Sequence, residues 1–101
     1  MWLTERVGRE VGRTVEVSGE RYLVGRAGDC DLTLADTNVS RWHAYLAELP
    51  DGAAEVHDLR SANGTWVDGR RVEQVRLNGG EQLQFGDTVF LASLTEHGNQ
   101  S

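Results

Sequence analysis

Short runs of alternating or β-branched residues, separated by turn signals, recur along the whole 101-residue chain. The clearest run is Gln82–Phe85, where Leu83 and Phe85 alternate with glutamines and are expected to face the interior. No stretch keeps a helical period over three turns. The pattern predicts about ten to eleven short strands. Their expected ranges are Trp2–Arg6, Thr14–Val17, Arg21–Gly25, Asp31–Leu34, His43–Leu49, Ala54–Leu59, Thr65–Val67, Arg71–Val72, Val75–Leu77, Gln82–Phe85 and Thr88–Leu94.

Turn-forming residues stand between these runs. Pro50-Asp51-Gly52 is a strong turn signal, and Asp68-Gly69 suits the type I′ turn of a hairpin. Twelve glycines and a single proline are typical of many tight turns between strands. We therefore expect an all-β sandwich or barrel of mostly antiparallel strands, forming one domain over residues 1–101. Residues 95–101 are polar and are expected to be frayed.

The net charge of the chain limits the kinds of molecule that it can bind. The formal net charge is −6, which argues against nucleic acid, because phosphate backbones are bound by a basic face. All ten basic residues are arginines. Codon usage in the source genome and the use of some arginines as two-pronged anion ligands can both explain this bias, and they can hold together. Only the positions of the arginines can separate these readings.

The remaining composition gives no sign of a cofactor, metal or membrane. Cys30 is the only cysteine, which excludes an intrachain disulfide and a cysteine-based zinc site and suggests a small buried side chain. His43, His57 and Cys30 lack the spacing of metal ligands. No apolar run approaches the ~18 residues of a membrane span, and the first residues do not form a signal peptide. We expect a soluble, cytoplasmic domain, which leaves open that it belongs to a larger protein.

Residues suited to binding an anion fall near the two longest polar connections, Ala35–Ser40 and Arg60–Gly64. Loops at one end of a rigid β scaffold commonly carry the binding groups. Arg26 ends one strand, while Ser40 and Asn63 lie in the two loops. A phosphate group offers three acceptor oxygens, which a guanidinium fork and hydroxyl donors can satisfy. A side-chain amide can also bond a peptide backbone, because it holds both a donor and an acceptor.

In this order and spacing, the motifs resemble the forkhead-associated domain, a β-sandwich that binds phosphothreonine in signalling proteins. The matching pieces are Gly25-Arg26, Ser40-Arg41-Trp42-His43 and Asn63-Gly64-Thr65. Flanking pieces also match: Asp31–Leu34, Asp58-Leu59 and Gly86-Asp87. The resemblance covers about residues 15–94. It implies a non-catalytic module of about ten to eleven strands that docks threonine-phosphorylated proteins downstream of a Ser/Thr kinase.

The resemblance also implies a role for each matching residue. Arg26 would grip the phosphate, Ser40 would donate its hydroxyl to it, and Arg41 would add a second contact. Asn63 would hold the main chain of the ligand. His43 would support the loops by hydrogen bonding, together with Gly25, Gly64 and Thr65. Asn38 and Arg60 are the residues expected to select the flanking residues of the ligand.

Three positions depart from the family pattern. Arg60 stands where glycine is common, and Ala62 stands where a hydroxyl side chain often contacts ligand. Asp68-Gly69 replaces the more usual asparagine-glycine pair. The change at Ala62 bears on affinity and not on the fold.

Other interpretations are weaker or remain open. Ser40, His43 and Asp58 include the residue types of a hydrolase triad, but no nucleophile elbow or oxyanion hole accompanies them. The three tryptophans are expected to be core or interface residues and not a base-stacking surface. The same fold could act without phosphate, as a scaffolding or dimerisation module. A positive patch is expected where five arginines fall in or near the loop end: Arg26, Arg41, Arg60, Arg70 and Arg71.

Overall fold

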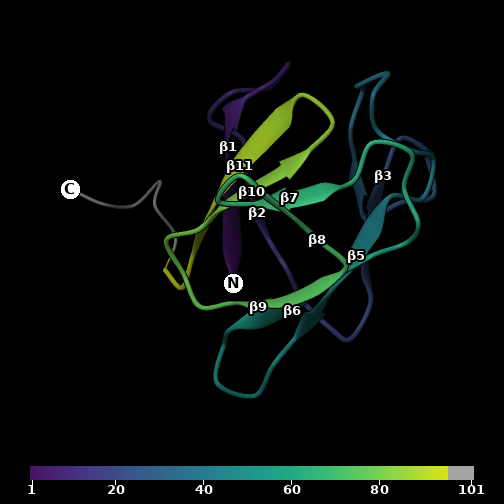
Figure 1. Cartoon of the computed structure of the whole chain (residues 1–101). Coiled ribbons are helices and arrows are strands. Elements are labelled where there is room, and N and C mark those ends of the chain that lie inside the picture. The colour runs from purple at the N-terminus through teal and green to yellow at the C-terminus, as the bar shows by residue number, and fades with distance from the viewer. Residues whose placement is uncertain (96–101) are drawn as a thin grey trace.

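The computed structural model describes residues 1–95. These residues form eleven strands in two sheets and no helix (Figure 1). The six-stranded sheet has the order β2-β1-β11-β10-β7-β8, and the five-stranded sheet has the order β4-β3-β5-β6-β9. The strands are β1 (Trp2–Val7), β2 (Thr14–Glu16), β3 (Tyr22–Gly25), β4 (Leu32–Thr33), β5 (Ala44–Glu48), β6 (Ala54–Asp58), β7 (Thr65–Val67), β8 (Arg70–Val72), β9 (Gln74–Leu77), β10 (Gln82–Phe85) and β11 (Thr88–Ser93).

The predicted all-β sandwich of mostly antiparallel strands is confirmed. Every ladder is antiparallel except the one that joins β3 to the edge strand β4. The β4 strand is shorter than the expected Asp31–Leu34, because only Val24 and Gly25 pair with it. The predicted frayed tail begins at Thr95, and the rest of that segment lies outside the described residues.

Inward-facing side chains of both sheets form one core. Leu83 and Phe85 are fully buried, as their alternation predicts, and Phe90 packs against Phe85 with its ring edge-on. Leu46 and Val56 contribute from the opposite sheet. No helix in residues 1–95 is long and apolar enough to cross a membrane.

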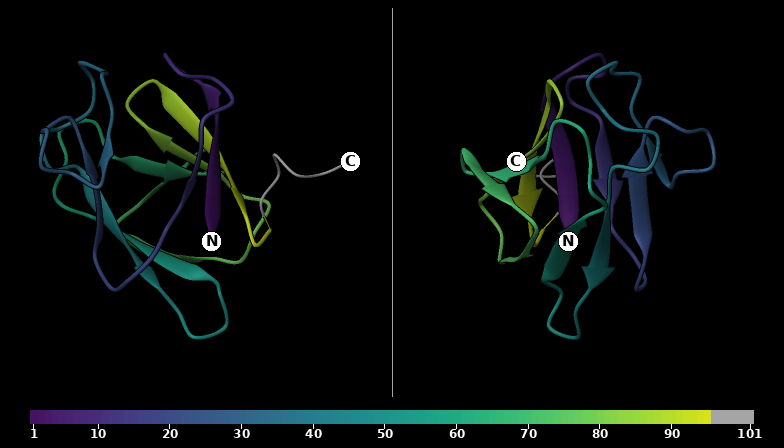
Figure 2. Two further views of the ribbon diagram at one scale, coloured as in Figure 1. Left: turned by 180° about the vertical axis from the view of Figure 1, so that it is seen from behind. Right: turned by 45° about the vertical axis from the view of Figure 1, so that its right-hand side comes forward.

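Three connections meet at one end of the sandwich: those following β3, β4 and β6. The N–H of Arg26 donates to the carbonyl of Ser40 (3.0 Å), and the N–H of Leu59 donates to the carbonyl of His43 (2.9 Å). In the left-hand view of Figure 2 these blue and teal connections lie together at the upper left. The sequence-predicted site residues of the three loops are therefore brought to one surface.

Candidate functional site

A glycine allows two of these loops to lie against each other. Gly25 ends β3, and the backbone of Arg41 crosses directly over it. The contact is continued by a hydrogen bond from the N–H of Ala27 to the carbonyl of Arg41 (3.0 Å). The buried thiol of Cys30 donates to the same carbonyl (3.3 Å), and burial raises the pKa of this thiol. Gly25 thus positions the Ser40–Arg41 segment beside Arg26.

A hydrogen bond from the Nε atom orients the guanidinium of Arg26. Its Nε–H donates to the carbonyl of Val39 (3.1 Å), while its two terminal nitrogens form no hydrogen bond with other residues in the described part of the chain. Arg26 lines a shallow hollow of about 130 Å³. The other lining residues are Thr37, Asn38, Val39, Ser40, Ala62 and Asn63. A guanidinium fixed at Nε and free at both ends suits a bidentate contact with an anion.

Ser40 joins the first loop to the second. Its Oγ accepts a hydrogen bond from the N–H of Ala62 (3.0 Å). The hydroxyl proton has no acceptor in the described residues, so it is available to a group placed in the hollow. Ser40 and Arg26 therefore present donors to the same space.

Asn63 is tied to the loop that carries Asn38. Its Nδ2 donates to the carbonyl of Asn38 (2.9 Å), and its own carbonyl accepts the indole N–H of Trp66 (3.0 Å). The Oδ1 atom and the second N–H of the Asn63 amide stay available. These two groups can pair with the C=O and N–H of an extended peptide.

His43 connects the loops from beneath. The side chain is fully buried, and its Nδ1 accepts the N–H of Ser40 (3.0 Å). Its Nε2 lies 2.9 Å from the carbonyl of Gly64, and a carbonyl can only accept, so Nε2 carries the proton. Burial lowers the pKa of His43, although the Gly64 carbonyl and the carboxylates of Asp58 and Asp36 act in the opposite direction. The ring is therefore neutral and holds one loop against the other.

Asp58 anchors the loop that carries Asn63, a role that sequence reasoning missed. Its carboxylate accepts the N–H of Ser61 (3.1 Å), the hydroxyl of Ser61 (2.5 Å) and the hydroxyl of Thr65 (2.7 Å). The Ser61 Oγ in turn accepts the N–H of Gly64 (3.0 Å). Partial burial raises the pKa of Asp58, but these hydrogen bonds more than offset it and leave the pKa below its ordinary value. The spacing of Asp58, Ser61 and Thr65, a carboxylate followed by two hydroxyl residues across one short loop, could have indicated this anchor in the sequence.

Arg41 is not among the residues that line the hollow. Its guanidinium lies over the ring of Trp42, 5.7 Å from the ring centroid. The indole N–H of Trp42 donates to Asp29 (3.0 Å), which fixes the orientation of the ring. Trp42 is 52% exposed and is not part of the core, which leaves the interface role of the core-or-interface prediction.

The expected positive patch is smaller than predicted. Arg60 is exposed in the loop after β6, and Arg71 lies against Gly64. Arg70 instead flanks the Asp68-Gly69 turn, at the other end of β7. Among the acidic residues, Glu5 is buried on β1 and forms an ion pair with Arg13 (2.9 Å).

Among residues 1–95, no group of three or more His, Cys, Asp or Glu side chains is arranged to hold a metal ion. The chemistry of the hollow comes from a guanidinium, a hydroxyl and an amide. Groups of these kinds are able to bind an anion and to pair with a peptide backbone.

Together, the fold and the loop cluster define a β-sandwich binding domain. A family model described as the inner membrane component of T3SS, cytoplasmic domain, matches residues 7–95. The chain is 42% identical over 87 residues to the ABC transporter ATP-binding/permease protein Rv1747 of Mycobacterium tuberculosis, covering 84% of this chain and 10% of that protein. The chain spans between 6% and 20% of the length of three curated relatives that it matches.

The similar solved structures are forkhead-associated (FHA) domains. One structure, of phosphothreonine-dependent FHA domain interactions, is 28% identical with a TM-score of 0.83 and covers 94% of this chain and 96% of that one. The FhaA FHA domain complexed with the intracellular domain of Rv3910 is 30% identical with a TM-score of 0.80, covering 89% and 96%. The chain belongs to the forkhead-associated domain family, whose fold the T3SS cytoplasmic domain shares.

Proposed function

We propose that this domain binds phosphothreonine in partner proteins and performs no catalysis. The observation that carries the proposal is the hollow at which unused donors of Arg26 and Ser40 converge beside the Asn63 amide. The phosphate pairs with the Arg26 fork and accepts the Ser40 hydroxyl, while Asn63 pairs with the ligand backbone. The similar solved structures that concern phosphothreonine-dependent interactions support this assignment.

The site residues divide into ligand contacts and supports. Arg26, Ser40 and Asn63 contact the ligand directly. Arg41 reaches the phosphate after its guanidinium leaves the ring of Trp42. His43, Gly25, Gly64 and Thr65 hold the loops in place. Asn38, which lines the hollow, and Arg60, which is exposed in the loop after β6, select the residues that flank the phosphothreonine.

The proposed ligand sets the biological setting. A Ser/Thr kinase supplies the phosphothreonine, and the domain docks the phosphorylated partner. We propose that this takes place in the cytoplasm and that the domain serves as one part of a longer protein, because its matched relatives are much longer than the chain.

The test is fluorescence-polarisation binding to a degenerate phosphothreonine peptide library. Unphosphorylated and phosphoserine libraries are the ligand controls. Arg26→Ala should lose at least about tenfold in affinity, because a charge-assisted hydrogen bond contributes roughly 1.5–3 kcal/mol. Arg76→Ala is the matched protein control, since Arg76 pairs with Asp51 in the turn between β5 and β6. Equal binding to phosphorylated and unphosphorylated libraries would reject the proposal.

The half-exposed Trp42 favours one alternative, a phosphate-independent scaffolding or dimerisation module. Exposed aromatic side chains of fixed orientation are frequent anchors of protein interfaces. Sedimentation of the unliganded domain over a range of concentrations separates the two functions. A dimer that is lost in Trp42→Ala and indifferent to phosphopeptide would support the alternative.

A further inference from the structure

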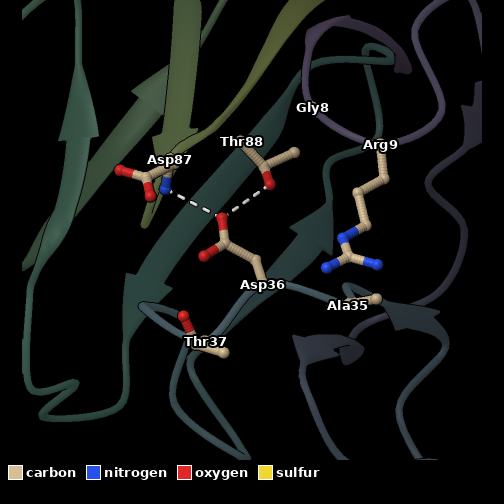
Figure 3. Close-up of a pocket in the computed structure, with 7 residues that line it drawn as sticks. All are labelled: Gly8, Arg9, Ala35, Asp36, Thr37, Asp87 and Thr88. Carbon is tan, nitrogen blue, oxygen red and sulfur yellow. Dashed lines mark hydrogen bonds between the residues drawn. The ribbon is translucent and has the colours of Figure 1, made fainter.

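Figure 3 shows the residues that line a second hollow, which has a volume of about 210 Å³. Its walls come from the β1–β2 connection, the loop after β4, and the turn between β10 and β11. Thr37 lines both hollows. The two hollows therefore adjoin at Thr37, and a peptide in the first hollow can extend toward the second.

The two carboxylates of the second hollow, Asp36 and Asp87, differ in the number of hydrogen bonds that they accept. Asp36 accepts the N–H of Asn38 (2.9 Å), the N–H of Asp87 (2.8 Å) and the hydroxyl of Thr88 (2.8 Å), so it serves the structure of the loops. Asp87 accepts a single hydrogen bond, from Nδ2 of Asn38 (2.7 Å). No arginine in residues 1–95 forms an ion pair with Asp87. The exposed charge of Asp87 is thus left without a cation.

Arg9 restricts where a cation can be bound. It forms the opposite wall of the hollow, and Figure 3 shows Asp36 between Arg9 and Asp87. A positively charged ligand group is repelled from the Arg9 wall and attracted to the Asp87 end. The hollow is therefore polarised, with its negative end nearest to Asn38.

A chain of two hydrogen bonds connects Asp87 to the proposed ligand contacts. Asn63 donates to the carbonyl of Asn38, and the side chain of Asn38 donates to Asp87. Asn38 is thus the single residue that links Asn63 to Asp87 through hydrogen bonds.

We propose that Asp87 selects a lysine or arginine side chain a few residues away from the phosphothreonine of the ligand. This inference rests on the proposed function. The site would then bind a dipolar motif, with the phosphate at the Arg26 end and a cation at the Asp87 end. Asn38 acts as a positioning residue, because it holds the Asp87 carboxylate beside the path of the peptide.

The experiment uses a phosphothreonine peptide in which lysine, alanine or glutamate is placed singly at each of the four positions on either side. Affinities are measured by fluorescence polarisation at low salt for the wild type, Asp87→Asn and Asp87→Lys. The Asp87→Asn change removes the charge and keeps an acceptor for Asn38. Asp51→Asn is the matched control, because it removes one carboxylate in the β5–β6 turn.

At one position, the wild type and Asp51→Asn should bind the lysine peptide about three- to fivefold more tightly than the alanine peptide. Asp87→Asn should lose this preference, and Asp87→Lys should prefer glutamate there. If phosphothreonine peptides bind but the lysine preference is absent or survives in Asp87→Asn, the inference is wrong and the proposed function stands. If no phosphothreonine peptide binds better than its unphosphorylated form, both fail.

Discussion

A Cβ atom on Gly25 would overlap the backbone carbonyl oxygen of Arg41 and would lie only 2.8 Å from the carbonyl carbon. Real Cβ atoms do not approach other heavy atoms this closely. The obstacle is backbone that is itself hydrogen-bonded to Ala27, so it cannot move aside as a flexible side chain could. Glycine at the end of β3 is thus a steric requirement of the binding site.

Gly25→Ala should therefore lower the free energy of unfolding by about 1–3 kcal/mol, the usual cost of overpacking. It should also weaken phosphopeptide binding, because the Ser40–Arg41 segment has to shift. Urea denaturation and fluorescence polarisation measure the two effects. Gly28→Ala is the matched control, since a Cβ there meets nothing within 4 Å. Equal stability of the two variants would contradict the steric explanation.

Arg60 has a φ of 56°, in the left-handed region that favours glycine. This backbone angle explains why glycine is common at the position. Arg60→Gly should raise the free energy of unfolding by about 0.5–1 kcal/mol through relief of strain. Arg60→Ala keeps the strain and should show no such gain in urea denaturation. If the guanidinium contacts ligand, both variants lose the same affinity; a loss confined to one would contradict that role.

The neutral state of His43 makes stability depend on pH. Its folded pKa is lowered from 6.5, so below about pH 6.5 the unfolded chain binds a proton that the folded chain does not. Acidification from about pH 7.5 to about pH 5.5 should therefore destabilise the fold, by at most about 1.4 kcal/mol per pH unit. The lowered pKa values of Asp36 and Asp58, below 3.8, act only at lower pH.

Urea denaturation across this range checks the pH dependence, and NMR titration of the imidazole checks its origin. The His57→Gln variant should keep the dependence, because His57 stacks on Tyr45 and pairs with Glu55, away from the loop cluster. A His43 imidazole that titrates at or above pH 6.5 would refute the explanation.

Ala62 leaves room for one more ligand contact. Its N–H is used by Ser40, and its side chain lines the hollow without a polar group. Ala62→Ser should strengthen phosphothreonine binding by roughly three- to tenfold, the equivalent of one net hydrogen bond. Calorimetric titration with a fixed phosphopeptide measures the gain. Ala62→Val, which adds a side chain without a donor, should not reproduce it; an equal gain would point to packing instead.

Local sequence pattern was enough to predict the strands but not all of their surroundings. Gln82–Phe85 matches β10 in full, and Asp68 and Gly69 both have the positive φ of a type I′ turn. Turn residues on both sides of a short strand fix where the strand begins and ends, so its bounds can be predicted from the sequence. The parallel pairing of β3 with β4 depends on contacts between segments that no local pattern encodes.

The surroundings of Glu5 and Trp42 depend on partners from other segments of the chain. Glu5 alternates with the buried Leu3, so period two indicates the inner face, but its burial also requires Arg13 from the next loop. The exposure of Trp42 similarly depends on Asp29, thirteen residues away. Arg26, Ser40 and Asn63 were correctly expected to lie together, because their motifs follow strand ends that the fold brings to one side.

The loops that carry these residues are already joined to one another through His43, Ser40 and Asn63. Loops that are already joined need no backbone rearrangement before a ligand arrives, so association can proceed at about 10⁵–10⁷ M⁻¹ s⁻¹. At a dissociation constant of about 1 µM, this association rate corresponds to a complex that lasts roughly 0.1–10 s. Partners then leave often enough for a phosphatase to reach the exposed phosphothreonine. The domain would therefore stay bound to its partner only for as long as the partner remains phosphorylated.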